Sequence, residues 1–352
     1  MSSAVDKVAT ILNRIWYGNS MAYLFLLPLS GLFALVSAAR RKLYQVGILR
    51  TCKVPVPVVV VGNITVGGTG KTPVTAWLVD VLKDKGMKPA IISRGYGGKV
   101  ADKVLQVTAA SDPGVAGDEP VLLARRTGCP VFVNANRVAS ALEAASQGAD
   151  VIVSDDGLQH YRLWRDAEIA VVDGSRGLGN GYLLPAGPLR EPERRLKSVD
   201  RVMVQRAVGD AGTRYGNRIL DTRMSRFSLA GETLHKIGDQ TTVELKTFNG
   251  QPVHAVAGIA NPERFFSQLE RHGLDVIRHP LPDHARISAD DISFDDDNAV
   301  IVTEKDAVKC SAIAHENLWY LPVHVVFDID QKSQWVTALH AKLLTYQSQD
   351  ST

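Results

Sequence analysis

Short apolar runs alternate with longer amphipathic stretches from residue 54 to near the end of the chain. The runs hold few polar positions, which is typical of parallel strands that are buried on both faces. This alternation predicts an α/β fold with a mostly parallel sheet and helices on both of its faces. The first predicted strands are Val56–Val61, Pro89–Ser93, Val104–Val107, Val131–Val133, Val151–Ser154, Ile169–Asp173 and Val202–Val204, and the helices between them include Pro73–Lys85, Glu119–Arg126 and Arg137–Gln147.

A second alternating set follows a stretch of weaker periodicity at 208–250. Turn residues such as Asn249-Gly250 occur there, so we place a domain boundary near residue 230. The predicted organisation is an N-terminal apolar segment 1–45, a nucleotide-binding domain 46–230 and a smaller α/β domain 231–352. The second set has predicted strands at Val253–Gly258, Val276–His279, Ala299–Thr303 and Tyr320–Phe327, and predicted helices at Pro262–His272 and Lys332–Leu344.

An uncharged stretch, Met21–Ala39, precedes the basic cluster Arg40-Arg41-Lys42. As a helix it would be about 28 Å long, close to the hydrocarbon thickness of a bilayer. The alternatives are a cleaved signal peptide, a spanning helix, a helix lying in the membrane interface and a buried core helix. Pro28 and Gly31 in mid-segment weaken the spanning interpretation. We expect peripheral or monotopic attachment, with the basic cluster meeting anionic head groups.

Composition narrows the class of protein. The 352 residues are 45% hydrophobic and 22% charged, which is ordinary for a globular protein and argues against disordered, fibrous and polytopic membrane classes. The net charge of +3 is too close to neutral to indicate nucleic acid binding. Cys52, Cys129 and Cys310 are scattered without zinc-site spacing, which favours a reducing, cytosol-facing compartment.

The first predicted strand leads into a glycine-rich turn, Gly62–Pro73 (GNITVGGTGKTP), and then a predicted helix. Glycines let backbone N–H groups converge on a phosphate, and the helix N-terminus adds positive potential. Lys71 can reach the β- and γ-phosphates, and the Thr72 hydroxyl can ligate Mg²⁺. Thr65 stands where the usual pattern has glycine. The context still predicts a P-loop ATP site, formed by Thr65, Val66, Gly67, Gly68, Thr69, Gly70, Lys71 and Thr72.

Acidic residues occur where a metal ion would be needed. Asp155 and Asp156 end a predicted strand, and carboxylates at that edge of a parallel sheet can hold Mg²⁺ directly or through water. Asp173 ends another strand in the same way, so a purely structural role stays open. Asp118 and Glu119 begin a predicted helix, where the alternative is N-terminal capping.

Three loops carry further polar residues. Ser93–Gly98 (SRGYGG) places a guanidinium and a phenol among glycines, which suits phosphate recognition. Pro188–Pro192 (PLREP) is a rigid charged loop to which residue types alone assign no chemistry. His284 follows Pro282-Asp283 in a turn, where a histidine is usually solvated.

These motifs form an ordered series with Gly117–Pro120 (GDEP), Asn134–Arg137 (NANR), Asp155–His160 (DDGLQH), Pro282–Ala285 (PDHA) and Thr303–Lys309 (TEKDAVK). Together with the apolar segment, the series resembles the tetraacyldisaccharide 4'-kinases, the lipid A kinases of Gram-negative bacteria. The resemblance covers nearly the whole chain, except that 208–250 matches nothing.

The resemblance implies a fold and an activity. It implies transfer of the γ-phosphoryl of ATP, with Mg²⁺, to the 4'-hydroxyl of a tetraacylated glucosamine disaccharide 1-phosphate, which makes the bis-phosphorylated lipid A precursor (lipid IVA). It also implies attachment to the cytoplasmic face of the inner membrane, and a P-loop domain with a smaller α/β domain that closes over the site. No nucleic acid and no obligate protein partner are inferred.

Residue roles follow from the matched motifs. Asp118 matches the catalytic carboxylate, and His284 matches the residue that pairs with it. Because these two residues fall in different predicted domains, we expect the pair to assemble only on closure. Lys71 and Thr72 match the loop lysine and the Mg²⁺-binding hydroxyl, and Glu119, Asp155 and Asp156 match acidic residues around the metal. The residues that would line the nucleotide or sugar-phosphate site are Asn63, Arg94, Tyr96, Arg137, His160, Arg190 and Glu191.

The main alternative is a membrane-attached P-loop ATPase switch without a lipid substrate. A guanine-specific switch is disfavoured, because the pattern N-K-x-D is absent and no residue separates Lys305 from Asp306. A noncatalytic membrane scaffold with a relic loop is the other alternative, and it would fail to bind ATP with Mg²⁺.

Overall fold

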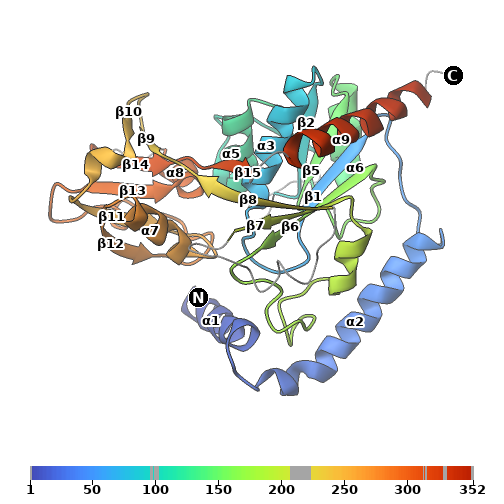
Figure 1. Cartoon of the computed structure of the whole chain (residues 1–352), viewed down its shortest axis with the longest axis horizontal. Coiled ribbons are helices and arrows are strands. Elements are labelled where there is room, and N and C mark those ends of the chain that lie inside the picture. The colour runs from blue at the N-terminus through green and yellow to red at the C-terminus, as the bar shows by residue number, and fades with distance from the viewer. Residues whose placement is uncertain are drawn as a thin grey trace. The chain divides into compact units, whose positions relative to one another are not determined.

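The structure is a computed structural model that describes residues 2–95, 98, 103–206, 223–311, 313, 315–327 and 331–349. The chain forms two compact units (Figure 1). Unit 1 contains Met1–Ser93, Asn136–Phe227 and Phe327–Thr352, and unit 2 contains Arg94–Ala135 and Ser228–Val326.

The domain boundaries differ from the predicted ones. The break after Phe227 lies close to the predicted boundary at residue 230, but 94–135 belongs to unit 2 and 327–352 belongs to unit 1. The reason is that helix α5 (Asp118–Thr127) contacts helix α8 (Glu304–Cys310), and Arg126 on α5 pairs with Glu304 on α8 at 2.9 Å. A boundary drawn along the sequence cannot show such an exchange of segments.

Unit 1 is built on a parallel sheet whose strands neighbour one another in the order β8-β7-β6-β1-β5-β2. Every residue of β1, β2, β5, β6 and β7 is buried, which explains why these strands read as continuous apolar runs. Because neighbouring strands are parallel, the loops after β1, β5 and β6 emerge at the same edge of the sheet. The bounds are β1 Val58–Gly62, β2 Pro89–Ser93, β5 Val151–Asp155, β6 Ala167–Asp173, β7 Arg201–Gln205 and β8 Met224–Ala230.

Helices pack against this sheet, as predicted. Helix α3 (Lys71–Asp84) contacts β1 and β5, and α6 (Arg137–Ser146) contacts β2 and β5. On α3, the ring of Trp77 stacks on Trp335 of α9 (Gln331–Gln349) with centroids 5.8 Å apart. A short 3₁₀ helix, η1 (Glu193–Ser198), precedes β7.

Two N-terminal helices, α1 (Ser2–Tyr17) and α2 (Tyr23–Gln45), precede the sheet (Figure 1). Within α2, all of which the structure describes, only Ser30 is buried, so the buried-core interpretation is wrong. The Ser30 hydroxyl donates to the Leu183 carbonyl at 2.8 Å, and the Tyr23 and Tyr182 rings stack at 5.0 Å. By length and composition alone, α2 is apolar enough to cross a membrane.

Unit 2 has a six-stranded sheet in the order β10-β9-β14-β13-β11-β12. Strands β11 to β14 are parallel to their neighbours in this set, whereas β9 is antiparallel to β10 and β14. Phe265 and Phe266 of α7 pack in one hydrophobic core, and Ala307 and Cys310 of α8 pack in another. The bounds are β9 Thr233–Lys236, β10 Thr242–Glu244, β11 Pro252–Ala257, α7 Pro262–Arg271, β12 Asp275–Pro280, β13 Ala299–Thr303 and β14 Leu318–Leu321.

In the remaining part of unit 2, the hydrophobic pattern of the sequence predicts the strands less well. Strands β9 and β10 lie in the stretch of weak periodicity at 208–250, for which the sequence predicts no elements and of which 208–222 is outside the described residues. The strand predicted at 320–327 is two strands, β14 and β15 (His324–Phe327), because Pro322 lacks the N–H that a ladder needs. The other elements are β3 (Leu105–Val107), which is antiparallel to β4 (Val131–Val133), α4 (Pro113–Ala116) and η2 (Leu245–Phe248).

We predict that Gly157→Ala destabilises the protein. A Cβ at this position would lie 2.5 Å from Ser154 Oγ and 2.9 Å from Val60 Cγ1, so the turn after β5 would be forced away from these β1 and β5 side chains. Overpacking of this kind lowers the free energy of unfolding by about 1–3 kcal/mol. Urea unfolding measures the change, with Gly31→Ala as the control because no atom lies within 4 Å of its added Cβ. An unchanged midpoint for Gly157→Ala would contradict the close approach.

Candidate active site

The loop after β1 presents the N-terminus of α3 as an anion site. Gly67 and Gly70 have φ of 101° and 82°, in the left-handed region that favours glycine. Gly70 is the N-cap of α3 and no side chain caps this end, so its first N–H groups can face a phosphate. Asn63 is fully buried, and its Nδ2 donates to the Gly67 carbonyl and to Thr69 Oγ1, both at 3.3 Å. Asn63, a predicted substrate residue, therefore braces the loop.

The PLREP segment lies beside the first half of this loop. Thr65 forms an antiparallel bridge with Leu189. The Val66 N–H donates to the Pro188 carbonyl at 2.8 Å, and the Arg190 N–H donates to the Ile64 carbonyl at 2.7 Å. These bonds explain the departure from the usual loop pattern, because a residue in an extended bridge needs no glycine and a β-branched side chain suits it.

The two carboxylates after β5 have different surroundings. Asp155 is buried and accepts a hydrogen bond from the Thr75 hydroxyl of α3 at 3.0 Å. The Arg137 guanidinium, also buried, donates to the Asp155 carbonyl at 2.8 Å. Asp156 has a left-handed φ of 48°. Asp155 thus lies behind the first turn of α3, and Arg137 supports the strand end.

Asp156 holds two cations at the phosphate loop. Its carboxylate accepts from Arg190 Nη1 at 3.0 Å and lies 3.8 Å from Lys71 Nζ. Burial alone would raise the pKa of Asp156, but Lys71 and Arg190 outweigh burial, and the pKa lies below its ordinary value. The group is therefore a carboxylate at neutral pH, and it keeps both cations together at the mouth of the loop.

The residues near α3 fit a magnesium ion that is shared with a nucleotide. Such an ion takes one or two protein oxygens and completes its shell with phosphates and water. Thr72 and Thr75 are one turn apart on α3 and so share a face, and Thr75 bonds Asp155. Thr72 and Asp155 therefore fit the ion best. Asp156 faces Arg190 and Lys71, and Glu119 in unit 2 faces Lys305 at 3.3 Å.

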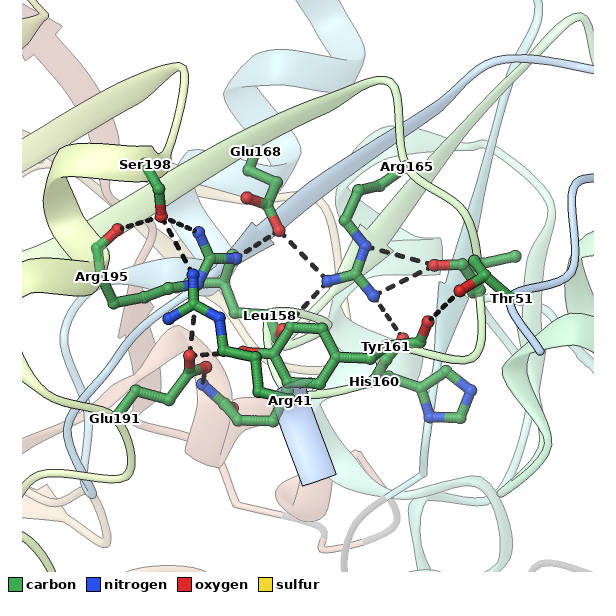
Figure 2. Close-up of polar contacts among 12 residues, drawn as sticks. Arg41, Thr51, Leu158, His160, Tyr161, Arg165, Glu168, Glu191, Arg195 and Ser198 are labelled. Atoms are coloured by element: carbon green, nitrogen blue, oxygen red, sulfur yellow. Dashed lines mark hydrogen bonds and ion pairs between the residues drawn. The ribbon is translucent and has the colours of Figure 1, made fainter. Parts of the chain in front are cut away.

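Glu191, predicted to line the sugar-phosphate site, is the centre of a buried polar network (Figure 2). Its carboxylate accepts from the Tyr161 hydroxyl at 2.5 Å and from Gln159 Nε2 at 2.8 Å, and it forms an ion pair with Arg195 at 3.2 Å. Burial, with Glu191 beside it, raises the pKa of Tyr161 to about 12. Glu191 thus holds the side chains of Tyr161, Gln159 and Arg195 in place.

His160 is close to several guanidinium groups. Burial first, and then the positive charges of Arg137, Arg165 and Arg40, together lower the pKa of its imidazole to about 4. The ring is therefore neutral at pH 7. His160 can donate or accept a hydrogen bond at a sugar-phosphate site, but it brings no positive charge.

Unit 2 brings Asp118 and His284 together. Asp118 Oδ2 lies 3.3 Å from His284 Nδ1, and Lys309 Nζ lies 3.8 Å from the same oxygen. Asp118 begins α5, whose N-cap is Gly117 without a side-chain cap. Both residues lie in the same unit, so the expectation that the pair assembles only on closure is wrong. The expectation is wrong because the predicted P-loop domain, 46–230, includes 94–135 and with it Asp118, whereas this segment belongs to unit 2.

Lys305 was not singled out from the sequence. Its Nζ lies 3.1 Å from His284 Nε2 and 3.3 Å from Glu119 Oε1. Burial would lower its pKa, but the carboxylates, Glu119 first, raise it, so Lys305 is an ammonium. Lys305 and Lys309 are four residues apart on α8, and this spacing in the TEKDAVK motif was the available signal.

The SRGYGG loop contributes little to the described site. Arg94 follows β2 and is exposed. Tyr96 lies outside the described residues.

Comparisons with known proteins agree with this geometry. A family model described as tetraacyldisaccharide-1-P 4'-kinase matches residues 22–343. The tetraacyldisaccharide 4'-kinase of Aromatoleum aromaticum is 51% identical over 88% of this chain and 91% of its own length. That of Nitrosococcus oceani is 47% identical over 91% of this chain and 92% of its own. A crystal structure of LpxK from Aquifex aeolicus in complex with ATP matches with a TM-score of 0.73 and 29% identity, over 90% of this chain and 99% of that one.

We predict that the His160 imidazole stays neutral as the pH falls. Its folded pKa of about 4 lies below the ordinary 6.5, so a proton binds only in strong acid. The ring resonances in an NMR titration should not move between pH 8 and pH 6, and the spectrum of His160→Gln identifies them. A midpoint near 6.5 would contradict the burial and the guanidinium contacts.

Proposed function

The chain belongs to the tetraacyldisaccharide 4'-kinase family, and from this premise we propose how its residues carry out the reaction. The protein is an ATP-dependent lipid A 4'-kinase. We infer that the acceptor is the 4'-hydroxyl of a tetraacylated glucosamine disaccharide 1-phosphate, and that the product is its bis-phosphorylated form, lipid IVA. The observation that best supports this mechanism is the hydrogen-bonded Asp118–His284 pair, because a kinase that acts on an alcohol needs a proton acceptor.

Unit 1 supplies the groups for the phosphoryl donor. Phosphoryl transfer depends on positioning and charge neutralisation more than on covalent help. Apart from the Val66 N–H, which donates to the Pro188 carbonyl, the N–H groups of the loop from Thr65 to Thr72 hold the phosphates, and Lys71 places its charge on the transferring group. Arg190, which also pairs with Asp156, is a second cation beside Lys71.

Mg²⁺ would be held by the Thr72 hydroxyl and by Asp155, directly or through water. When bound, it neutralises charge on the β- and γ-phosphates. Asp156 keeps Lys71 and Arg190 oriented, and Glu119 stays with Lys305 in unit 2.

Asp118 is the proton acceptor in this mechanism, and His284 orients it. The Lys305 ammonium has only donors, so the His284 Nε2 at 3.1 Å must accept. The ring proton of neutral His284 is then on Nδ1, which donates to Asp118 Oδ2 at 3.3 Å. A histidine held in this tautomer fixes the carboxylate in place and leaves its other oxygen for the sugar hydroxyl.

We further infer that the protein works at the cytoplasmic face of the inner membrane, peripherally or monotopically. A disaccharide with four acyl chains stays in the bilayer, and ATP is cytoplasmic. Six large apolar side chains of α2 are exposed, and the basic cluster follows them. Such a helix buries its apolar face in the interface while its cations meet anionic lipid. The exposed apolar side chains include Leu24, Phe25, Leu29, Leu32, Leu35 and Val36.

We predict that Asp118→Asn collapses lipid phosphorylation. The amide cannot accept the hydroxyl proton, and loss of a general base lowers turnover by about 10²–10⁴-fold. The assay is transfer of labelled γ-phosphate from ATP to a tetraacyl disaccharide 1-phosphate in detergent micelles. Asp112→Asn is the matched control, because Asp112 is an exposed helix cap in the same unit. A folded wild type that binds ATP but labels no lipid would favour the ATPase switch.

We predict that His284→Ala lowers kcat and leaves ATP binding intact. Without the imidazole, Asp118 loses the donor that orients it, and misplacement of a catalytic group costs about 10²-fold. Steady-state kinetics at saturating lipid and ATP test this, with ATP affinity measured separately by calorimetry. Unchanged turnover would remove His284 from the mechanism and leave Asp118 to act alone.

A further inference from the structure

The basic end of α2 is bonded to the loop that follows the two carboxylates of β5. Arg40 Nη1 donates to the Gln159 carbonyl at 3.2 Å. The same guanidinium lies 5.6 Å from the Tyr44 ring centroid and 5.9 Å from the Tyr161 ring centroid, and these two rings lie 6.0 Å apart. Arg40 therefore joins the apolar helix to Gln159 by one hydrogen bond and to Tyr161 by one cation–π contact, while its contact with Tyr44 lies within α2.

The contact continues inward through Tyr161. Its hydroxyl donates to buried Glu191, which also accepts from the Gln159 side chain at 2.8 Å. Arg195 pairs with Glu191 and with Glu168, and Figure 2 shows Glu168 between Arg195 and Arg165. Because these charges are buried, each depends on its partner, and the network has little freedom to rearrange.

The network ends at the phosphate loop. Gln159 Nε2 also donates to the carbonyl of Asn63, the residue that braces the loop, at 3.0 Å. Gln159 Oε1 lies 3.5 Å from Arg190 Nη1, which holds Asp156. A continuous series of contacts thus runs from Arg40 through Gln159 to the groups that hold Lys71.

We propose that Arg40 and Tyr161 are positioning residues, through which the membrane-facing helix α2 sets the placement of Gln159, Arg190 and the phosphate loop. The proposal rests on the kinase function. It assigns Arg40 a positioning role in addition to its positive charge. Lys42, at the same end of α2, is exposed and contributes positive charge alone. Neither Arg40 nor Tyr161 touches the reacting atoms.

The test compares Arg40→Ala with Lys42→Ala in uncharged detergent micelles, where the 1-phosphate of the substrate is the only anionic lipid head group. Each variant removes one positive charge from the same end of α2. We expect kcat/KM for ATP to fall about tenfold in Arg40→Ala and much less in Lys42→Ala, while KM for the lipid stays within about twofold in both. Arg40→Lys should recover part of the loss, because an ammonium can donate to the Gln159 carbonyl and lie over both rings.

Tyr161→Phe supplies the second arm. It keeps the ring beside Arg40 and removes the hydroxyl that bonds Glu191, so kcat/KM for ATP should fall as in Arg40→Ala. The double variant should lose less than the product of the two single losses, because both substitutions break the same connection. This arm also serves if Arg40→Ala does not fold.

Equal losses in Arg40→Ala and Lys42→Ala would overturn the proposal and leave Arg40 as a membrane charge. Unchanged kinetics in Tyr161→Phe, or independent losses in the double variant, would overturn it as well. Lipid labelling by wild type in the same micelles separates the two failures, because its absence rejects the kinase function and its presence confines the failure to this inference.

Discussion

The parallel pairing of β1 with β5 is the constraint on which the nucleotide-binding half of the molecule depends. It brings the phosphate loop and Asp155-Asp156 to one edge of the sheet. Gly157 lets the turn after these carboxylates pack against both strands, because an added Cβ would clash with the Ser154 and Val60 side chains. Thr75 on α3 then reaches Asp155, so the helix that presents its N-terminus to phosphate is fastened to the strand that carries the carboxylates.

In each unit, the charged residues of the candidate site are paired with residues of opposite charge. In unit 1, Asp156 gathers Lys71 and Arg190, and in unit 2, Asp118 and Glu119 face Lys309 and Lys305. A partly buried cation or carboxylate without a partner would shift toward its neutral form. The pairings keep Asp156 and Lys305 charged and hold their partners in place, and phosphoryl transfer needs such positioning more than it needs covalent help.

The sequence predicted the parallel strands well, because strands buried on both faces leave continuous apolar runs. It also located the P-loop, because the spacing of Gly67, Gly70 and Lys71 serves a local purpose. It could not separate residues that touch a ligand from those that brace the site. Glu191 and Arg137 are charged residues in ordered motifs, yet both are buried and bond other groups of this chain. The Asp118–His284 contact depends on how 94–135 folds, which periodicity does not encode.

The N-terminal helix is part of the same argument. A helix with an exposed apolar face could be a simple tether, linked to the body only by chain connectivity. In this structure, Ser30 bonds the Leu183 carbonyl and Arg40 bonds the Gln159 carbonyl, so α2 is held at its middle and at its basic end. Leu183 precedes the PLREP segment and Gln159 follows the β5 carboxylates. The apolar helix is therefore fastened to both segments that flank the phosphate loop.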